Sequence, residues 1–424
     1  MSELLTRSES WFFVAICLLA ILLNELIYFR KGRDIVWLFV FINLIALLFF
    51  FMQESTLLKE PSAIFSLSML LAVFLFPIGY FVTFFTNGRR ILKEKERLLL
   101  LSQKLSINSL FLINRVGYFF YFFAFIYELS VAGWVFPLFS ENKLQAYYSF
   151  PQNFVHYLVV ASIPITIIFS FLYFLNGKKN KIDVLVIGIM LVFNLLILAR
   201  AVFMTQFFML VYFWAISRGL KINIKYLTYC GISILIFITI VGYYRTGDTY
   251  RILLDIGGLN HWPDWMVPLA WPYLYFSTSI ENFRNIYHTF DPDMLTYGFR
   301  TPIIYLFSIL QDKESIPYWG YAETSAAGFN TFGIFLTSYY DFYIFFPIYF
   351  FILGMIVGYI KKSDSLALRL FWPYLIYCIF TSPINDYLSN FFTFVYILYL
   401  FLAVFLAKLN SKKNGSTKGI FHDN

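Results

Sequence analysis

Long apolar runs constrain this chain most strongly. The hydrocarbon core of a bilayer is crossed by roughly 20 helical residues, and inside it every backbone amide must be satisfied within its own segment. Eleven runs meet that description, so the sequence predicts an all-α polytopic membrane protein with about 11 transmembrane helices, or 12 to 13 if further short pieces cross. The predicted spans are residues 11–29, 35–52, 63–85, 108–127, 154–175, 182–199, 201–217, 226–244, 342–360, 366–382 and 391–406.

Composition excludes several other classes of protein. The chain has 424 residues, of which 60% are hydrophobic and only 13% are charged, so a soluble domain of this length could not bury its apolar surface. All three cysteines lie in apolar runs, which removes a disulfide framework and a thiolate metal site. No phosphate-binding glycine loop, HExxH or G-x-S-x-G motif is present. We therefore expect no metal, no cofactor and no nucleotide-driven chemistry.

Basic residues divide the connecting segments into two sets. Of the 32 Lys and Arg residues, 22 lie in alternate connections and in the tail from Lys408, which the positive-inside rule places in the cytoplasm. The first run is followed by "RKGR", which predicts an external amino terminus. Because the positive charge is divided between the two membrane faces, we expect no nucleic-acid partner. The predicted organisation is one integral membrane domain, residues 1–407, with a large external segment at about 245–341, and a disordered cytoplasmic tail, residues 408–424.

The remaining basic residues are mostly arginine. The cytoplasmic set holds 15 Lys and seven Arg, whereas the other ten comprise seven Arg and three Lys. A planar guanidinium stays charged and binds phosphate or carboxylate with two parallel hydrogen bonds, so this inversion favours an anionic ligand on the external face. Snorkelling or ion-paired arginines at the interface are the alternative. Among them, Arg115 lies inside the fourth run and is expected to pair with Glu128 or with a backbone carbonyl.

The long external segment is not a plain soluble loop. Residues 266–280, 301–310 and 326–340 are apolar but short, which predicts interfacial or re-entrant pieces that cover a cavity. Residues 245–325 contain four Arg and one Lys against nine acidic residues. The overall charge of this segment is therefore negative and would not attract an anionic ligand. Tryptophans 262, 265 and 271, near His261 and Asp264, are either interfacial anchors or flat surfaces for a sugar.

The segment "SIENFRNIYHTF" carries ionisable residues at helical spacing. Glu281, Arg284 and His288 follow each other at spacings of three and four, which predicts that they share one helical face. A surface helix with an ordinary Glu to Arg pair is the alternative. Asp341, at the predicted start of a spanning helix, is either an N-cap or a general base. Asn330 and Asp386 are further candidates for contacts with sugar hydroxyls.

Four segments together resemble the bacterial O-antigen polymerases (Wzy), also called oligosaccharide repeat unit polymerases. The resemblance covers roughly residues 180–407. It departs from some family members in that no external arginine is followed by glycine eleven positions later. The segments are "LARAVFMTQFFMLVYFWAISRG" (198–219), "GYYRTGD" (242–248), "YLYFSTSIENFRNIYHTF" (273–290) and "FNTFGIFLTSYYDF" (329–342).

This resemblance implies a fold and a reaction. It implies a GT-C-like glycosyltransferase of the bacterial inner membrane that joins undecaprenyl-pyrophosphate-linked repeat units on the periplasmic face, without metal, in lipopolysaccharide biosynthesis. Its partners would be these lipid-linked glycans, membrane lipid and a chain-length regulator protein. We expect five arginines to stabilise the pyrophosphate leaving group and three residues to serve as candidates for the general base. The arginines are Arg200, Arg245, Arg251, Arg284 and Arg300, and the candidate bases are His288, Glu281 and Asp341.

Three other functions are compatible with parts of this pattern. An O-antigen ligase would use the same arginines and the same donor. A flippase for lipid-linked repeat units would be a transporter with short loops, against which the long external segment argues. A membrane O-acyltransferase would need a histidine deep in a helix, and the four histidines fit that pattern poorly.

Overall fold

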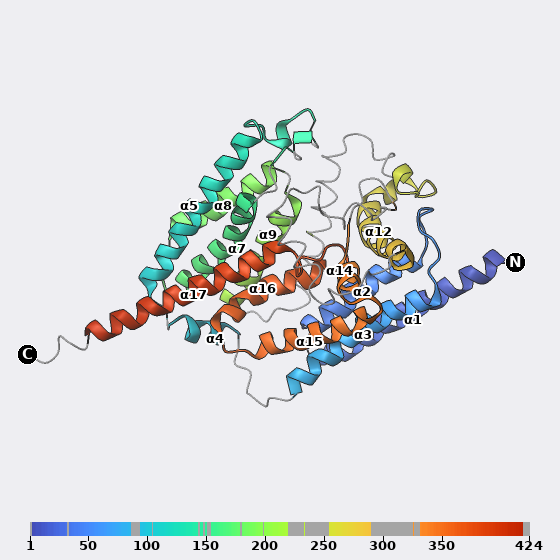
Figure 1. Ribbon diagram of the computed structural model, residues 1–424, viewed down its shortest axis with the longest axis horizontal. Coiled ribbons are helices and arrows are strands. Elements are labelled where there is room, and N and C mark those ends of the chain that lie inside the picture. Colours follow the sequence, from blue (N-terminus) through green and yellow to red (C-terminus); the bar gives the residue numbers. More distant parts are fainter. Residues whose placement is uncertain are drawn as a thin grey trace, which may run out of the picture. The chain divides into compact units, whose positions relative to one another are not determined.

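In the residues that the computed structural model describes, the regular secondary structure is helical. The structure describes residues 2–31, 34–85, 94–103, 105–142, 145–146, 149–150, 154–178, 180–197, 199–218, 233, 254–289, 325 and 331–418. Within these ranges it has 13 α-helices (Figure 1). They are α1 (Ser2–Lys31), α2 (Ile35–Phe51), α3 (Ala63–Phe85), α4 (Glu94–Ser102), α5 (Ile107–Val131), α7 (Phe154–Leu175), α8 (Lys181–Leu196), α9 (Arg200–Ser217), α12 (Val267–Thr289), α14 (Ile334–Phe342), α15 (Phe346–Lys362), α16 (Leu366–Thr381) and α17 (Phe391–Lys418), with short 3-10 turns at Pro137–Phe139, Asp264–Met266 and Tyr343–Phe345.

The helices have the length and surface of membrane spans. Six stretches among the described residues are long and apolar enough to cross a bilayer. Large apolar side chains also point outward, as on α1, where Trp11 is 61% exposed and Leu26 is 72% exposed. A soluble protein rarely exposes such a continuous apolar surface. The chain is thus built as a multi-pass membrane protein. The six stretches are Ser10–Tyr28, Ala63–Thr83, Ile107–Val131, Leu158–Leu175, Ile334–Lys362 and Phe392–Leu409.

Most predicted spans coincide with helices. The bounds of α3 and α7 are those predicted from the apolar runs. The predicted span at 226–244 and the predicted interfacial piece at 301–310 lie outside the described residues. Two predictions need correction: α12 is a helix of 23 residues rather than a short piece at 266–280, and α17 continues to Lys418, so the predicted boundary at residue 407 is not a helix end.

The break between α14 and α15 has a local cause. The sequence predicted one span from residue 342, but α14 ends at Phe342 and α15 begins at Phe346. Pro347 is in the first turn of α15, where its missing N–H leaves no intrahelical bond unmade and its fixed φ favours the start of a helix. Tyr343 takes φ = +50° at the break, a backbone region that non-glycine residues rarely adopt.

The helices form two compact units, which are described separately. Unit 1 comprises residues 1–88, 231–361 and 378–390, and unit 2 comprises residues 89–230, 362–377 and 391–424. In unit 1, α2 packs against α1, α3 and α12, and α12 also contacts α14. In unit 2, α7 packs against α5, α8, α9 and α17.

Glycines allow α3 and α15 to touch backbone to backbone within unit 1. A Cβ atom at Gly354 of α15 would overlap the carbonyl oxygen of Phe76 on α3, and one at Gly79 of α3 would overlap that of Phe351. Gly358, one turn further along α15, faces the carbonyl oxygen of Tyr80 at 2.9 Å from its missing Cβ. Small residues spaced by four are the usual means of close helix approach in membranes.

Candidate functional site

Buried polar side chains gather on one stretch of α12. Ser277, Thr278, Ser279, Glu281 and Asn282 are each at most 1% exposed. Buried polar groups require hydrogen-bond partners, since an unsatisfied one costs about 1 to 3 kcal/mol. This stretch of α12, held between α2 and α14 in unit 1, is therefore the best candidate for a functional site.

Glu281 and Arg284 form a buried, two-point ion pair. The Nε of Arg284 donates to Oε2 of Glu281 at 2.9 Å, and its Nη2 donates to Oε1 at 2.6 Å. The Arg284 side chain is 10% exposed and that of Glu281 is 1% exposed. Glu281 and Arg284 share one face of α12 as predicted, and the side chain of His288 lies outside the described residues. The Glu to Arg pair of the alternative is present, but the surface helix is wrong, because α12 buries this face.

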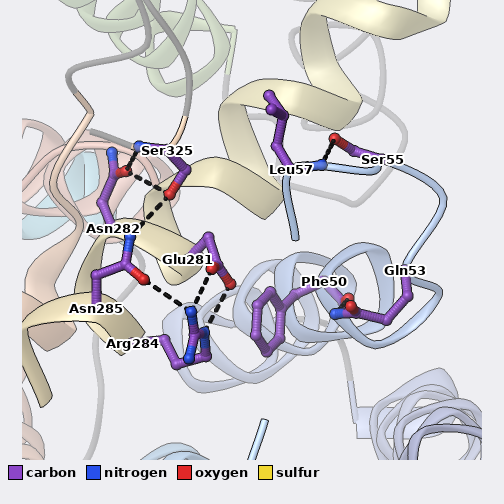
Figure 2. A network of polar contacts seen from close by, with 9 residues as sticks. All are labelled: Phe50, Gln53, Ser55, Leu57, Glu281, Asn282, Arg284, Asn285 and Ser325. Carbon is purple, nitrogen blue, oxygen red and sulfur yellow. Dashed lines mark hydrogen bonds and ion pairs between the residues drawn. The ribbon is translucent and has the colours of Figure 1, made fainter. Parts of the chain in front are cut away.

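Two asparagines extend the pair toward a neighbouring segment, as Figure 2 shows. Nη2 of Arg284 also donates to Oδ1 of Asn285 at 2.7 Å, and Nδ2 of Asn285 donates to Oγ of Ser325 at 3.1 Å. The Oδ1 of Asn282 accepts from both the backbone N–H and the hydroxyl of Ser325, while its Nδ2 donates to the carbonyl of Thr331 at 3.1 Å. The guanidinium is thus oriented by Glu281 and Asn285, while Ser325 joins the two asparagines.

The hydroxyl of Ser279 ties α12 to two other segments. It donates to the carbonyl oxygen of Pro383 at 2.7 Å and accepts from the backbone N–H of Gly333 at 2.9 Å. The N–H of Ile334 donates to the carbonyl oxygen of Ser382 at 2.8 Å. Gly333 is required here because a Cβ would overlap the carbonyl oxygen of Pro383. Residues 331–334, α12 and the loop after α16 thus meet in unit 1.

Asp386 and Asp341 add two carboxyl groups at this meeting point. Asp386 accepts hydrogen bonds from the hydroxyl of Thr337 and from the backbone N–H groups of Leu388 and Ser389. Asp341 is 5% exposed and lies one helical turn after Thr337, on the same face of α14. The prediction that Asp341 is the N-cap of a spanning helix is wrong, because it lies in the last turn of α14, whose N-cap is Gly333.

Desolvation makes Asp386 sensitive to pH. Burial raises the pKa of the Asp386 carboxyl above its usual value, against the opposing effect of its hydrogen bonds from Ser389 and Thr337. A pKa that is higher in the folded protein means that this group favours folding fully below about pH 4 and loses that contribution as pH rises through the folded-state value.

We therefore expect Asp386→Asn to gain thermal stability relative to the wild type as pH rises from about 4 to 8. The uncharged amide escapes the desolvation cost of the carboxylate and can still accept the Leu388 and Ser389 hydrogen bonds. Thermal unfolding of the purified protein in detergent micelles across this pH range would measure the difference. Asp255→Asn, which changes an exposed carboxyl, is the control and should show no such trend. A constant Asp386→Asn difference over the range would contradict the prediction.

Aromatic side chains pack behind the polar groups. Phe283, on α12 between Asn282 and Arg284, contacts Phe65, Tyr287, Tyr339 and Phe346 at centroid distances of 5.3 to 5.9 Å. Mostly edge-to-face contacts of this kind hold the ring positions firmly. The polar residues of α12 are therefore supported by a cluster of packed aromatic rings.

The predicted tryptophan surface is only partly assembled. Trp262 packs on Tyr273 at 5.2 Å and Trp271 stacks on Tyr275 at 5.6 Å, whereas Trp265 is 74% exposed. His261 lies 3.0 Å from Glu54, and both side chains are well exposed. Tyr273 in turn accepts from the backbone N–H of Glu54. These contacts attach the segment before α12 to the connection between α2 and α3.

The structure does not describe the side chains of the other predicted site residues. Arg245, Arg251 and Arg300 lie outside the described residues, as do the side chains of Arg200 and His288. The backbone of Arg200 opens α9, which belongs to unit 2, whereas Arg284 belongs to unit 1. Asn330 is also outside the described part of the chain. Glu281, Arg284, Asp341 and Asp386 are thus the predicted site residues whose side chains the structure places.

Other polar residues were missed or misassigned. Ser279, Asn282 and Thr337 were not predicted, although the polar run "STSIEN" inside an apolar helix is a usable signal. Arg115 pairs with Asp183 at 3.4 Å rather than with Glu128, and Glu128 instead contacts Nδ1 of His156 at 2.9 Å. Both pairs lie in unit 2.

Comparison with known proteins gives no assignment. Among the described residues, no three His, Cys, Asp or Glu side chains are gathered as a metal site would need. No protein-family model, no curated protein and no solved structure matches this chain.

Proposed function

We propose that this chain is an O-antigen polymerase, a glycosyltransferase that joins polyprenyl-pyrophosphate-linked oligosaccharides at the external face of the bacterial inner membrane. The observation that carries the proposal is the buried pair of Glu281 and Arg284, set in a polar network within a multi-pass bundle. Ionisable groups inside such bundles are rare and usually functional. The resemblance of residues 180–407 to this family, including a GT-C-like fold, supports the same reading.

The proposed chemistry needs a cation that is already oriented. When the bond between the anomeric carbon and the pyrophosphate oxygen breaks, negative charge grows on the leaving group, and a preorganised guanidinium stabilises it. Glu281, Asn285 and the bonds of Asn285 to Ser325 hold Arg284 in one orientation. Arg200, Arg245, Arg251 and Arg300 are proposed as additional donors to the same diphosphate.

The acceptor sugar must lose a proton. As its hydroxyl oxygen forms the new bond to the anomeric carbon, a carboxylate within hydrogen-bond reach takes the proton and releases it to solvent or to the departing pyrophosphate. Asp341 and Glu281 are the candidate carboxylates with described side chains, and His288 remains a candidate beside them. Asp386, which accepts three hydrogen bonds from the chain itself, acts in this proposal by holding α14 in place.

We expect Arg284→Lys to remain in the membrane but to make little polymer. Lysine keeps the positive charge, but a single ammonium cannot form the two parallel bonds of the guanidinium. Lipopolysaccharide gels of a deletion strain that carries each variant would show the loss of the ladder, and immunoblots of membrane fractions would show the amount of protein. Arg115→Lys is the matched control, since it alters an arginine paired with a carboxylate in unit 2 and should leave the ladder intact.

The deletion strain itself separates the rival functions. Core that bears one repeat unit is expected for a lost polymerase, whereas bare core would indicate a flippase or a ligase. Full-length polymer from the lysine variants of Arg245, Arg251 and Arg284 alike would overturn the proposed role of the guanidinium groups.

A further inference from the structure

A polar seam runs along the contact between α5 and α7 in unit 2. The two helices are antiparallel, and Asn114 meets Ser170 near one end of the contact while Glu128 meets His156 near the other. Between these ends, the missing Cβ of Gly117 faces the hydroxyl of Thr166. At the Asn114 end, Tyr118 donates to Asp183 at 2.6 Å. The seam is thus polar at intervals along most of α5.

Several polar atoms of this seam have no hydrogen-bond partner among the described residues. They belong to side chains that are almost fully buried, with Tyr121, Glu128 and Thr166 at 0% exposure and Asn114 at 3%. Tyr399 of α17, which packs against both α5 and α7, presents a fifth such atom. The atoms are Oδ1 of Asn114, the hydroxyl of Tyr121, Oε2 of Glu128, Oγ1 of Thr166 and the hydroxyl of Tyr399.

Leaving these groups unsatisfied would be costly. Each buried polar group without a partner costs about 1 to 3 kcal/mol, so five together would cost about as much as the whole stability of a typical domain. Lipid tails offer no hydrogen bonds, and the side chains lie on three different helices, so one side-chain rotation cannot pair them. A bound molecule that both donates and accepts hydrogen bonds is needed.

Two of the unpaired hydroxyls converge beside Gly117. A Cβ atom built on Gly117 would lie 3.3 Å from Oγ1 of Thr166 and 3.6 Å from the hydroxyl of Tyr399, so these two oxygens converge beside the α5 backbone. A buried water usually makes two to four hydrogen bonds, and these two hydroxyls supply the first two. The 3.3 Å contact is tighter than an ordinary Cβ contact, so a methyl group on residue 117 would press on the Thr166 hydroxyl and compete with a bridging water.

We propose that the α5–α7 seam binds internal water, with one molecule bridging Thr166 and Tyr399 beside Gly117 and others meeting Tyr121, Asn114 and Oε2 of Glu128. The seam is then a hydrated polar strip inside a membrane-spanning bundle. It ends on a carboxylate that is held by an imidazole. This site lies in unit 2 and does not depend on the glycosyl transfer proposed for unit 1.

Radiolytic hydroxyl-radical footprinting of the full chain in lipid nanodiscs tests the proposal, because radicals formed from bound water modify the side chains beside it. We expect Tyr121 to be modified several-fold more than Tyr374, an equally buried tyrosine of the same unit whose hydroxyl is bonded to Thr393. Equal modification of these two tyrosines would show that the seam is dry and would overturn the proposal.

Variants locate the bridging water. Gly117→Ala places a methyl group against Oγ1 of Thr166 and the hydroxyl of Tyr399, where it competes with the bridging water, and should lower modification of Tyr399 several-fold. Gly188→Ala is the matched control, since its Cβ meets nothing within 4 Å, and should change nothing. If Gly117→Ala does not fold, Thr166→Val keeps the side-chain shape, removes one partner of the water and should lower Tyr399 modification as well. Unchanged modification of Tyr399 in a folded Gly117→Ala or Thr166→Val variant would overturn this placement.

Discussion

Gly354→Ala is expected to lose about 3 kcal/mol or more of folding stability, at or beyond the upper end of the usual range for overpacking. The added methyl group overlaps the backbone carbonyl oxygen of Phe76, and the Cβ position is 2.8 Å from the backbone nitrogen of Tyr80. A backbone atom cannot move aside as the end of a flexible side chain can, so α3 and α15 must separate along their contact. Thermal unfolding of the purified variant in micelles, together with its yield in membranes, would measure the loss.

Other glycines provide the comparison for Gly354. Gly79→Ala acts from the α3 side of the same contact, so it should be about as damaging, and the double variant should lose less than the sum of the two because one separation of the helices relieves both overlaps. Gly188→Ala again serves as the control, as its Cβ has open space. A Gly354→Ala protein with wild-type unfolding temperature would show that α3 and α15 do not touch in this way.

Removing one partner of the pair formed by Glu281 and Arg284 is expected to cost about 3 to 5 kcal/mol. Arg284→Met leaves a carboxylate that is 1% exposed without its counter-charge, and Glu281→Leu leaves the guanidinium buried. Replacing both residues at once removes both charges, so Glu281→Leu with Arg284→Met should be much more stable than the sum of the single losses predicts. Chemical or thermal unfolding of the four proteins gives the coupling energy.

An exposed pair in the same unit shows how much burial contributes. Glu54 and His261 are also 3.0 Å apart, but their side chains are 36% and 53% exposed. Surface pairs are worth about 0 to 1 kcal/mol, so Glu54→Gln should change stability by no more than that. Single losses at Glu281 and Arg284 of similar small size, or strictly additive losses, would contradict the buried ion pair.

Apolar runs predicted the spanning helices well because a span is defined by local composition. The bounds of α3 and α7 follow from uninterrupted apolar stretches with polar flanks. The length of α12 was missed because Glu281, Asn282 and Arg284 end the apolar run at residue 280, although the helix continues to Thr289 and buries these side chains. Residue composition alone does not distinguish a polar stretch that ends a helix from one that lies buried within it.

The sequence could predict only those contacts of the candidate site that join residues close together along the chain. The spacing of Glu281 and Arg284 predicted their contact, since residues three apart share a helical face. Their burial depends on how α2 and α14 cover α12, and spacing carries no information on that. The bond from Ser279 to Pro383 joins residues 104 positions apart, and Arg115 pairs with Asp183 rather than with Glu128 on its own helix. Such partners are set by packing between helices.

The hydroxyl of Ser279 has a consequence for biosynthesis. It bonds to Gly333 and to Pro383, so it joins segments that leave the ribosome at well-separated times. While only the earlier part of the chain has been made, the partners of Ser279 and of the Ile334 amide do not yet exist. Assembly of this region must therefore wait for translation to pass the loop after α16, and a nascent chain stopped before that point would hold α12 with its polar face still open.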